Sequence, residues 1–187
     1  MRSRFSRGGF GRRGARRKEP VSWIRSASNA ANAAGAGAAL TLFTPNVLVT
    51  GAQDLRLTLR RLKVDILPVI TAAPTNADSF LVWGIILVGI TEGVPSPLFI
   101  TAADQRADWL SHGIIGNNQY RQAAQTEAIA GTAKDMVIDV RAMRKVDADQ
   151  AIVLTYDIFN PATGAIDATG RVQLNAFSSA LFSRTMK

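Results

Sequence analysis

Arginine residues crowd the first eighteen positions of the chain, MRSRFSRGGFGRRGARRK, and this stretch contains no acidic residue. Its eight cations are Arg2, Arg4, Arg7, Arg12, Arg13, Arg16, Arg17 and Lys18. The whole chain of 187 residues has 22 Lys and Arg against 14 Asp and Glu, so the 14 cations after residue 18 balance all of its acids. The net charge of +8 therefore belongs to the arm. Such charge is what drives binding to a phosphate backbone.

The arm also carries rings that could contact bases. Phe5 and Phe10 lie among Arg and Gly residues, and exposed aromatic rings stack on the bases of single strands. If the eight cations neutralise eight phosphates, the logarithm of the affinity for single-stranded nucleic acid should fall with the logarithm of the salt concentration with a slope of about −5 to −6. Phosphate contacts do not distinguish DNA from RNA. We therefore predict that residues 1–18 bind nucleic acid, the alternative being a tail that only keeps the chain soluble.

A second, weaker basic set in the body comprises Arg56, Arg60, Arg61 and Lys63. On a strand that faces nucleic acid, these side chains would extend the footprint of the arm. Alternatively, they form the solvated face of an edge strand and are neutralised by Asp54 and Asp65.

Catalytic and metal chemistry have little support. The chain has no cysteine and one histidine, His112, which excludes thiolate metal sites and multi-histidine sites within one chain. The acid pairs Asp104/Asp108 and Asp147/Asp149 are interpreted as a helix face and a turn, because neither has the ligand density of a cation-binding loop. We expect no enzyme activity, no catalytic or metal-binding residue, and no cofactor.

Composition divides the chain into three parts. Residues 1–18 are the Arg-rich arm, and residues 19–39 are small, mostly uncharged and interrupted by glycine, which predicts a flexible hinge rich in Ala, Gly, Ser and Asn. Residues 40–187 form a body large enough to bury a core. Its longest apolar run, residues 80–90, has eleven residues, whereas a membrane-spanning helix needs about 20. We expect no membrane partner.

The body has the two-residue periodicity of β-strands. Leu55, Leu57 and Leu59 alternate with polar residues, and the pattern then slips by one residue at Arg60–Arg61 before it resumes through residues 62–66. Such a slip would exchange the two faces of the strand, so a bulge or bend is expected there. Pro68 and Pro74 are expected to close this segment.

Further strand candidates are residues 41–50, broken by Pro45, and 79–90, 98–101, 136–142, 152–158 and 171–176. Residues 79–90 are apolar on both faces, as in a strand inside a two-sheet sandwich. Residues 102–111 are predicted to form one short helix, and residues 118–130 remain open between helix and loop. Seven or eight strands at this spacing predict an all-β antiparallel sandwich or jelly roll.

This layout of cationic arm, hinge and short-strand body resembles the capsid proteins of small icosahedral viruses. It most resembles the single jelly-roll capsid proteins of Rep-encoding circular single-stranded DNA viruses, and the capsid protein of satellite tobacco necrosis virus is similar in build. The segments that carry the resemblance, besides the Arg-rich start, are RRLKVDILPVI at 60–70, SFLVWGIILV at 79–88 and VIDVRAMRKVDADQAIVLTYDIF at 137–159.

The resemblance implies an eight-stranded antiparallel jelly roll of two four-stranded sheets, many-copy self-assembly into an icosahedral shell, and a disordered basic arm on a single-stranded genome inside the virion. It favours DNA over RNA. Residues 12–18 also resemble a nuclear-import cluster, which would add host import machinery as a partner and the host nucleus as a location. Two other classes stay open: a cellular nucleic-acid-binding protein, ribosome- or nucleoid-associated, with a basic tail, and a sandwich-fold enzyme with a localising arm.

Overall fold

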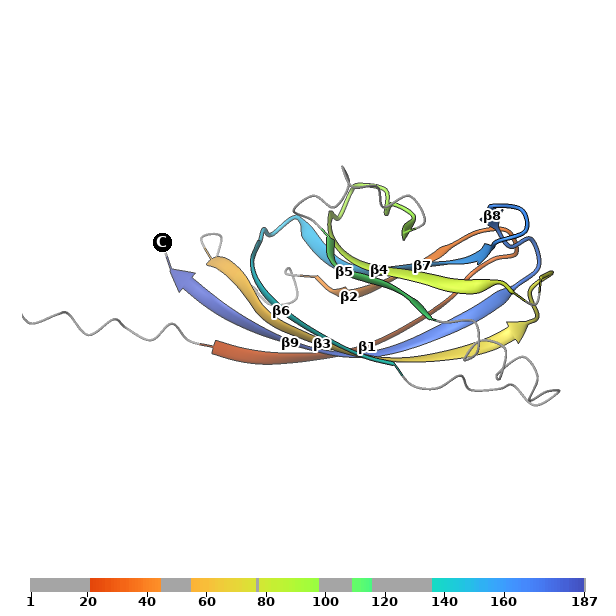
Figure 1. The fold of residues 1–187 in the computed structure, drawn as a ribbon. Helices are drawn as coiled ribbons and strands as arrows, with labels where there is room; N and C mark the ends of the chain where they lie inside the picture. Colours follow the sequence, from red (N-terminus) through yellow and green to blue (C-terminus); the bar gives the residue numbers. More distant parts are fainter. Residues whose placement is uncertain (1–20, 45–54, 77, 98–108, 116–135, 187) are drawn as a thin grey trace, which may run out of the picture.

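The computed structural model describes residues 21–44, 55–76, 78–97, 109–115 and 136–186. The described residues form nine β-strands (Figure 1): β1 (Val21–Ala31), β2 (Ala38–Phe43), β3 (Leu55–Ala72), β4 (Phe80–Gly89), β5 (Trp109–Ile115), β6 (Met136–Val146), β7 (Gln150–Asn160), β8 (Ala165–Ile166) and β9 (Arg171–Met186). Within these ranges the structure has no α-helix. None of its described segments is therefore a helix that could span a membrane.

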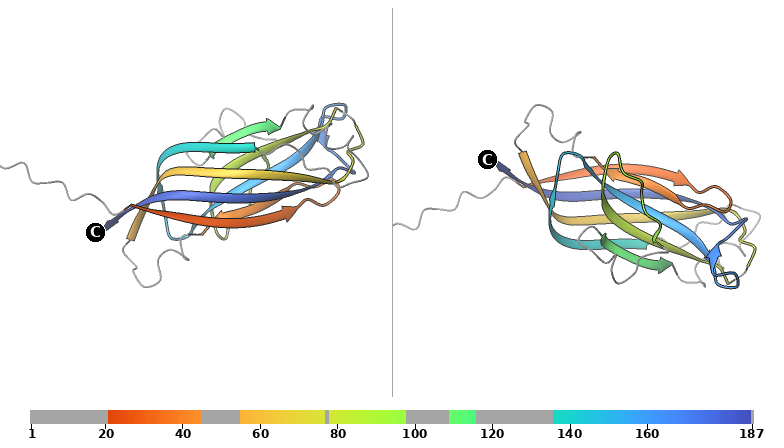
Figure 2. Two further views of the ribbon diagram at one scale, coloured as in Figure 1. Left: turned by 90° about the horizontal axis from the view of Figure 1, so that it is seen from below. Right: turned by 90° about the horizontal axis from the view of Figure 1, so that it is seen from above.

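The strands lie in two antiparallel sheets that face each other. Sheet A has the order β1-β9-β3-β6 (Figure 2, left), and sheet B has the order β2-β7-β4-β5, with β8 pairing to β7. Apart from the two-residue β8, the strands pair as the two arms of one long hairpin would: β1 pairs with β9, β2 with β7, β3 with β6, and β4 with β5. Rolling that hairpin places alternate pairs in opposite sheets. This strand order is that of a jelly roll.

The predicted antiparallel jelly roll is thus confirmed, and two local expectations are corrected. Residues 21–31 of the expected flexible hinge form β1, which pairs with β9 along its whole length. The helix expected over 102–111 is wrong at its end, because Trp109 begins β5, while residues 101–108 lie outside the described residues. The strand candidates around 45–50 and 98–101 also lie outside them.

The predicted slip at Arg60–Arg61 is a register shift in β3. Leu59 pairs with Phe182 and Arg61 with Leu181, so β3 has one extra residue relative to β9 at this point. Because of this bulge, the leucines on both sides of it reach the core, and Leu59 and Leu62 are fully buried. Bulges bend strands, and Figure 1 shows sheet A curling at the end where β6 turns into β7.

Of the two prolines expected to close this segment, Pro68 lies within β3, which continues to Ala72 and ends before Pro74. Proline cannot donate a backbone hydrogen bond, so it is confined to places where one side of the strand lacks a partner. The pairing of β3 with β6 ends at Ile66 and Met136, while Pro68 still pairs with Leu174 of β9. Among the described residues, residues 67–72 of β3 therefore have β9 as their one neighbouring strand, and this part of β3 tolerates proline.

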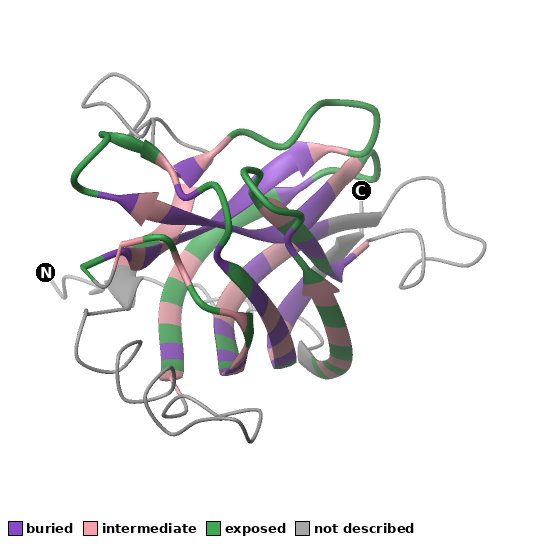
Figure 3. Cartoon of the chain, turned by 90° about the vertical axis from the view of Figure 1, so that its right-hand side faces the viewer, coloured by how far each residue is buried: buried purple, intermediate pink, exposed green. Residues whose placement is uncertain are grey.

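The two sheets differ in their outer faces. In sheet A, buried and exposed residues alternate along the strands, as the banding in Figure 3 shows. In sheet B, β4 and β7 are buried on both faces. Residues Ile86, Val88, Ala151 and Val153 form a separate buried cluster on the outer side of sheet B, and Trp109 packs against it. Sheet A is therefore the face that offers polar and charged side chains.

Hydrogen bonds fix the turn after β1. The buried Asn32 side chain accepts a bond from the Val172 amide (2.6 Å) and donates to the carbonyls of Ala33, Ala36 and Gly170. The Tyr156 hydroxyl lies 2.9 Å from the carbonyl oxygens of Ala30 and Val172. Burial raises the pKa of the Tyr156 phenol above its ordinary value, so it remains a donor. These bonds tie β1 to β9 and to sheet B.

Asp167 joins two connections at the same end of the sandwich, and its backbone carbonyl accepts a bond from the Gly35 amide in the turn after β1. This fully buried carboxylate accepts bonds from the amides of Thr75 (3.0 Å), Thr169 (3.0 Å) and Gly170 (2.8 Å) and from the Ser79 hydroxyl (3.0 Å). Burial alone would raise the pKa of Asp167, but the hydrogen bonds outweigh it and hold the pKa well below its ordinary range. The connection between β3 and β4 is thereby tied to the one between β7 and β9.

Gly37 makes room for a second buried carboxylate. Asp157, 2% exposed, accepts a hydrogen bond from the Ser96 hydroxyl, and a Cβ on residue 37 would lie 1.7 Å from its Oδ1. We expect Gly37→Ala to displace the carboxylate and lower the free energy of unfolding by about 1–3 kcal/mol, as measured by urea denaturation. Gly93→Ala is the control, because a Cβ there meets nothing within 4 Å. Equal effects of the two variants would contradict the close approach.

Candidate nucleic-acid interface

The principal predicted site lies outside the described residues. This applies to the eight cations of the arm and to Phe5 and Phe10. What the structure describes is the strand into which the arm leads. β1 begins at Val21, three residues after Lys18, and lies at the edge of sheet A. The arm therefore joins the body at this sheet.

Two members of the weaker basic set lie on the outer face of sheet A. Lys63 is exposed, and Arg61 is partly exposed. Arg60 lies within the bulge, and the backbone of Arg56 pairs with Thr185 of β9. The alternative of an edge strand is wrong for residues 57–66, because β3 pairs there with β9 on one side and β6 on the other. Arg60, Arg61 and Lys63 thus lie inside sheet A.

Strand register brings other side chains beside them. Three rows cross the outer face from β1 through β9 and β3 to β6: Trp23–Leu181–Arg61–Arg141, Arg25–Ser179–Lys63–Asp139 and Ala27–Phe177–Asp65–Val137. We call these twelve residues the sheet A grid. It holds four cations and two carboxylates. Arg25 and Arg141 were not among the predicted site residues, although both sit at exposed positions of a two-residue alternation.

One carboxylate is surrounded by three of these cations. Arg61 donates to both oxygens of Asp139, through Nε at 2.8 Å and through an Nη group. The hydrogen bonds from Arg61 lower the pKa of Asp139, and the charges of Lys63 and Arg141 lower it further. The same bonds raise the pKa of Arg61. Asp139 therefore neutralises one cation of the group, and the surroundings remain positive.

Exposed aromatic rings lie on the same face. Trp23 is 50% exposed and Phe177 is 52% exposed, although tryptophan and phenylalanine normally contribute most when they are buried. A shallow hollow beside Phe177 is lined by Arg25, Ala27, Asp65 and Ser179, among others. The sheet A grid therefore combines cations with accessible rings, which are the two components of surfaces that bind single strands.

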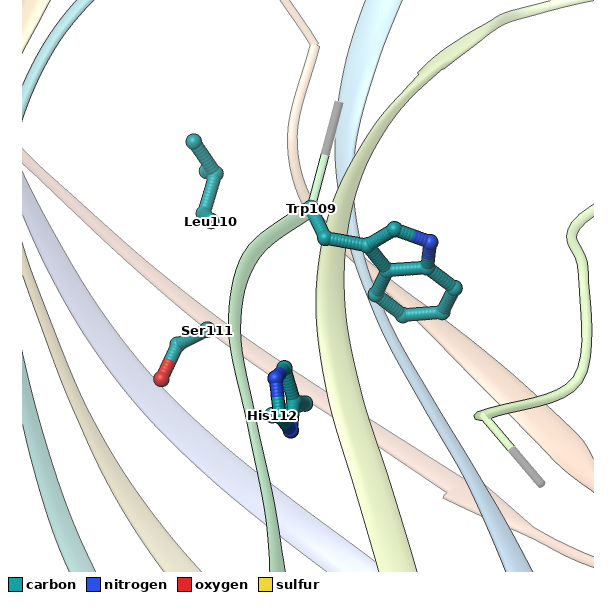
Figure 4. A pocket seen from close by; sticks show the side chains of 4 residues that line it. All are labelled: Trp109, Leu110, Ser111 and His112. Atoms are coloured by element: carbon teal, nitrogen blue, oxygen red, sulfur yellow. The ribbon is translucent and has the colours of Figure 1, made fainter. Parts of the chain in front are cut away.

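Another hollow lies along β5, lined by Trp109, Leu110, Ser111 and His112 (Figure 4). Ser111 and His112 are consecutive residues, and their side chains lie on opposite sides of the strand. The pair consequently lacks the geometry in which histidine activates a serine hydroxyl. Across the described ranges, no three His, Cys, Asp or Glu side chains are grouped to hold a metal ion. Asp104 and Asp108 lie outside those ranges.

Comparison with known proteins gives similarity at the level of structure. No protein-family model and no curated protein sequence matches the chain. A solved structure from Desmodium yellow mottle tymovirus is 14% identical over 100% of this chain and 98% of that chain, with a TM-score of 0.32. One from turnip yellow mosaic virus is 16% identical over 100% and 93%, with a TM-score of 0.31. One from mud crab tombus-like virus is 10% identical over 95% and 96%, with a TM-score of 0.26.

These similarities come from viruses, but from other groups than the single-stranded DNA viruses and the satellite virus that the sequence resembles. At such identities and scores they add no argument about function. The features of the chain that bear on its function are its own strand order and its charge distribution.

Proposed function

We propose that this chain is a viral capsid protein that self-assembles into a closed icosahedral shell and packages a single-stranded genome through its Arg-rich arm, residues 1–18. The observation that carries the proposal is continuity of charge. An acid-free arm with all the net charge leads into β1, and β1 borders the face on which Arg25, Arg61, Lys63 and Arg141 lie. A genome bound by the arm would lie against that face.

The charge distribution suits assembly in many copies. Residues 19–187 have balanced charges, so bodies packed side by side do not repel one another through net charge. The arms would repel one another inside a shell unless phosphates neutralised them. Sixty copies, one for each equivalent position of an icosahedron, would bring about 480 arm charges. Assembly and packaging would then be coupled through counterion release.

Three finer features belong to the same proposal. The genome is single-stranded DNA, as the sequence resemblance favours. The protein resides in the virion, and residues 12–18 direct it to the host nucleus during infection. The second candidate function is a cellular nucleic-acid-binding protein with a basic tail. The body charge disfavours that alternative, because such proteins are expected to carry excess cations on the folded surface as well.

Analytical ultracentrifugation and a salt titration together test this proposal. We expect the purified full-length chain to sediment as a large, uniform particle, and its binding to a single-stranded oligonucleotide to weaken with a log–log salt slope of about −5 to −6. A small monodisperse species with the same slope would favour the cellular nucleic-acid-binding protein. A slope near zero would contradict polyanion binding by the arm.

A further inference from the structure

We propose that the sheet A grid contains a base-stacking site for single-stranded nucleic acid, in which Trp23 and Phe177 take bases about four nucleotides apart and Arg25 binds a phosphate of the intervening segment. This inference deepens the proposed function and rests on it, because the arm is what brings the strand to this face. The site differs from the arm in its chemistry: it would recognise bases, whereas the arm recognises phosphate charge.

Register places the three side chains on one face of two adjacent strands. Trp23, Arg25 and Ala27 are alternate residues of β1, and Phe177 lies directly opposite Ala27 on β9. Trp23 and Phe177 are thus separated by four residues along the strand direction, or about 13 Å. That distance is roughly four base steps at the spacing of a stacked strand. Arg25 lies halfway between the two rings.

The surroundings of each ring favour a base over a phosphate. Phe177 is flanked by Asp65 on β3, directly opposite it, and borders the hollow that Arg25 and Ser179 also line. The Asp65 carboxylate would repel a phosphate but can accept a hydrogen bond from the exocyclic amino group of a base. Phosphates would instead lie toward Arg25 and Lys63, which face each other across Ser179.

Nucleic acid fits this face better than a second copy of the chain does. Trp23 follows Lys18 by only five residues, so a strand held by the arm is already beside the first ring. The grid also holds four cations against two carboxylates, and the same face on a second copy would carry the same excess. Positive faces repel each other, whereas phosphates are attracted to both.

The test compares two ligands of equal charge. A 20-nucleotide oligodeoxycytidylate and an abasic strand with the same number of phosphates are titrated against the full-length protein at high salt, where the contribution of the arm is screened. We expect the protein to prefer the strand that has bases. Trp23→Leu and Phe177→Leu, which keep apolar bulk but remove the ring, should each weaken binding to oligodeoxycytidylate about tenfold. Their affinity for the abasic strand should not change.

Matched variants separate stacking from bulk. Met143→Leu exchanges another exposed apolar side chain of sheet A, 71% exposed, and should leave both affinities unchanged, while Phe177→Trp should retain binding. The inference would be overturned if the wild-type protein bound the two strands with equal affinity, or if the Leu variants kept the preference for the strand with bases. In either case, a steep salt slope of the wild-type protein would leave the proposed function intact. Leu variants that change only the sedimentation coefficient would assign this face to a second copy and also overturn it. Absence of salt-dependent binding would defeat both proposals.

Discussion

Deleting residues 2–18 is expected to abolish nucleic-acid packaging and to leave the body folded. The deletion removes all eight cations of the arm. Without these eight phosphate contacts, the affinity of the protein for nucleic acid falls by several orders of magnitude at physiological salt. The body keeps its fold because the deletion ends before β1 at Val21, and β1 is held by β9, Asn32 and Tyr156. The measurements are the 260/280 nm absorbance ratio of the particle fraction and circular dichroism.

A charge-preserving control separates charge from sequence. Replacing the seven arginines of residues 2–17 by lysine keeps the net charge and should retain most of the packaged nucleic acid, because phosphate binding depends mainly on charge. Replacing the same residues by glutamine should behave like the deletion. Deletion particles with undiminished nucleic-acid content would show that the body packages the genome without the arm.

Asp167→Ala is expected to cause the largest loss of stability among single substitutions in the described part of the chain. The substitution leaves the partly buried amides of Thr75 and Thr169, the buried amide of Gly170 and the buried Ser79 hydroxyl without their shared acceptor. Each donor to a charged acceptor contributes about 1.5–3 kcal/mol, although such contributions do not add. We expect a loss of about 3–5 kcal/mol in the free energy of unfolding, measured by urea denaturation at neutral pH.

The same carboxylate predicts a pH dependence. The pKa of Asp167 is lowered in the folded state, so its stabilising effect is complete above the unfolded-state pKa of about 3.9 and declines as the pH falls below that value. The stability difference between wild type and Asp167→Asn should therefore be smaller at pH 3 than at pH 7. Asp139→Asn is the control, since this carboxylate pairs with Arg61 at the surface and surface pairs contribute little. A constant difference for the Asp167 variant across this range would contradict the account.

The sequence pattern predicts well which side chains of a strand are buried, as long as one face of that strand lies toward the core. The slip at Arg60–Arg61 is an example: the leucines and branched residues on both sides keep their own period, so a bulge or bend is needed to bury both sets, and the structure has a register shift there. Of the two prolines expected to close the same strand, Pro68 lies within it. Whether proline is tolerated depends on where the pairing with β6 ends, and β6 begins at Met136, 68 residues later in the sequence.

β1 was missed for a related reason. Apart from Val21, Trp23 and Ile24, its residues are mostly small or polar, VSWIRSASNAA, so composition alone indicates a flexible segment. The strand is stabilised from outside, by β9 and by the hydrogen bonds of Asn32 and Tyr156. The sheet A grid could not be predicted for the same reason. Arg25, Lys63 and Asp139 come from three distant segments, and only the strand order places them in one row.

Negative-stain electron microscopy of the purified full-length protein, with the 260/280 nm absorbance ratio of the same fraction, tests the central claim most directly. The jelly-roll strand order, the neutral body and the +8 arm together predict uniform closed particles with a ratio typical of packaged nucleic acid. A small monodisperse species under conditions in which the protein still binds oligonucleotides would contradict the capsid function.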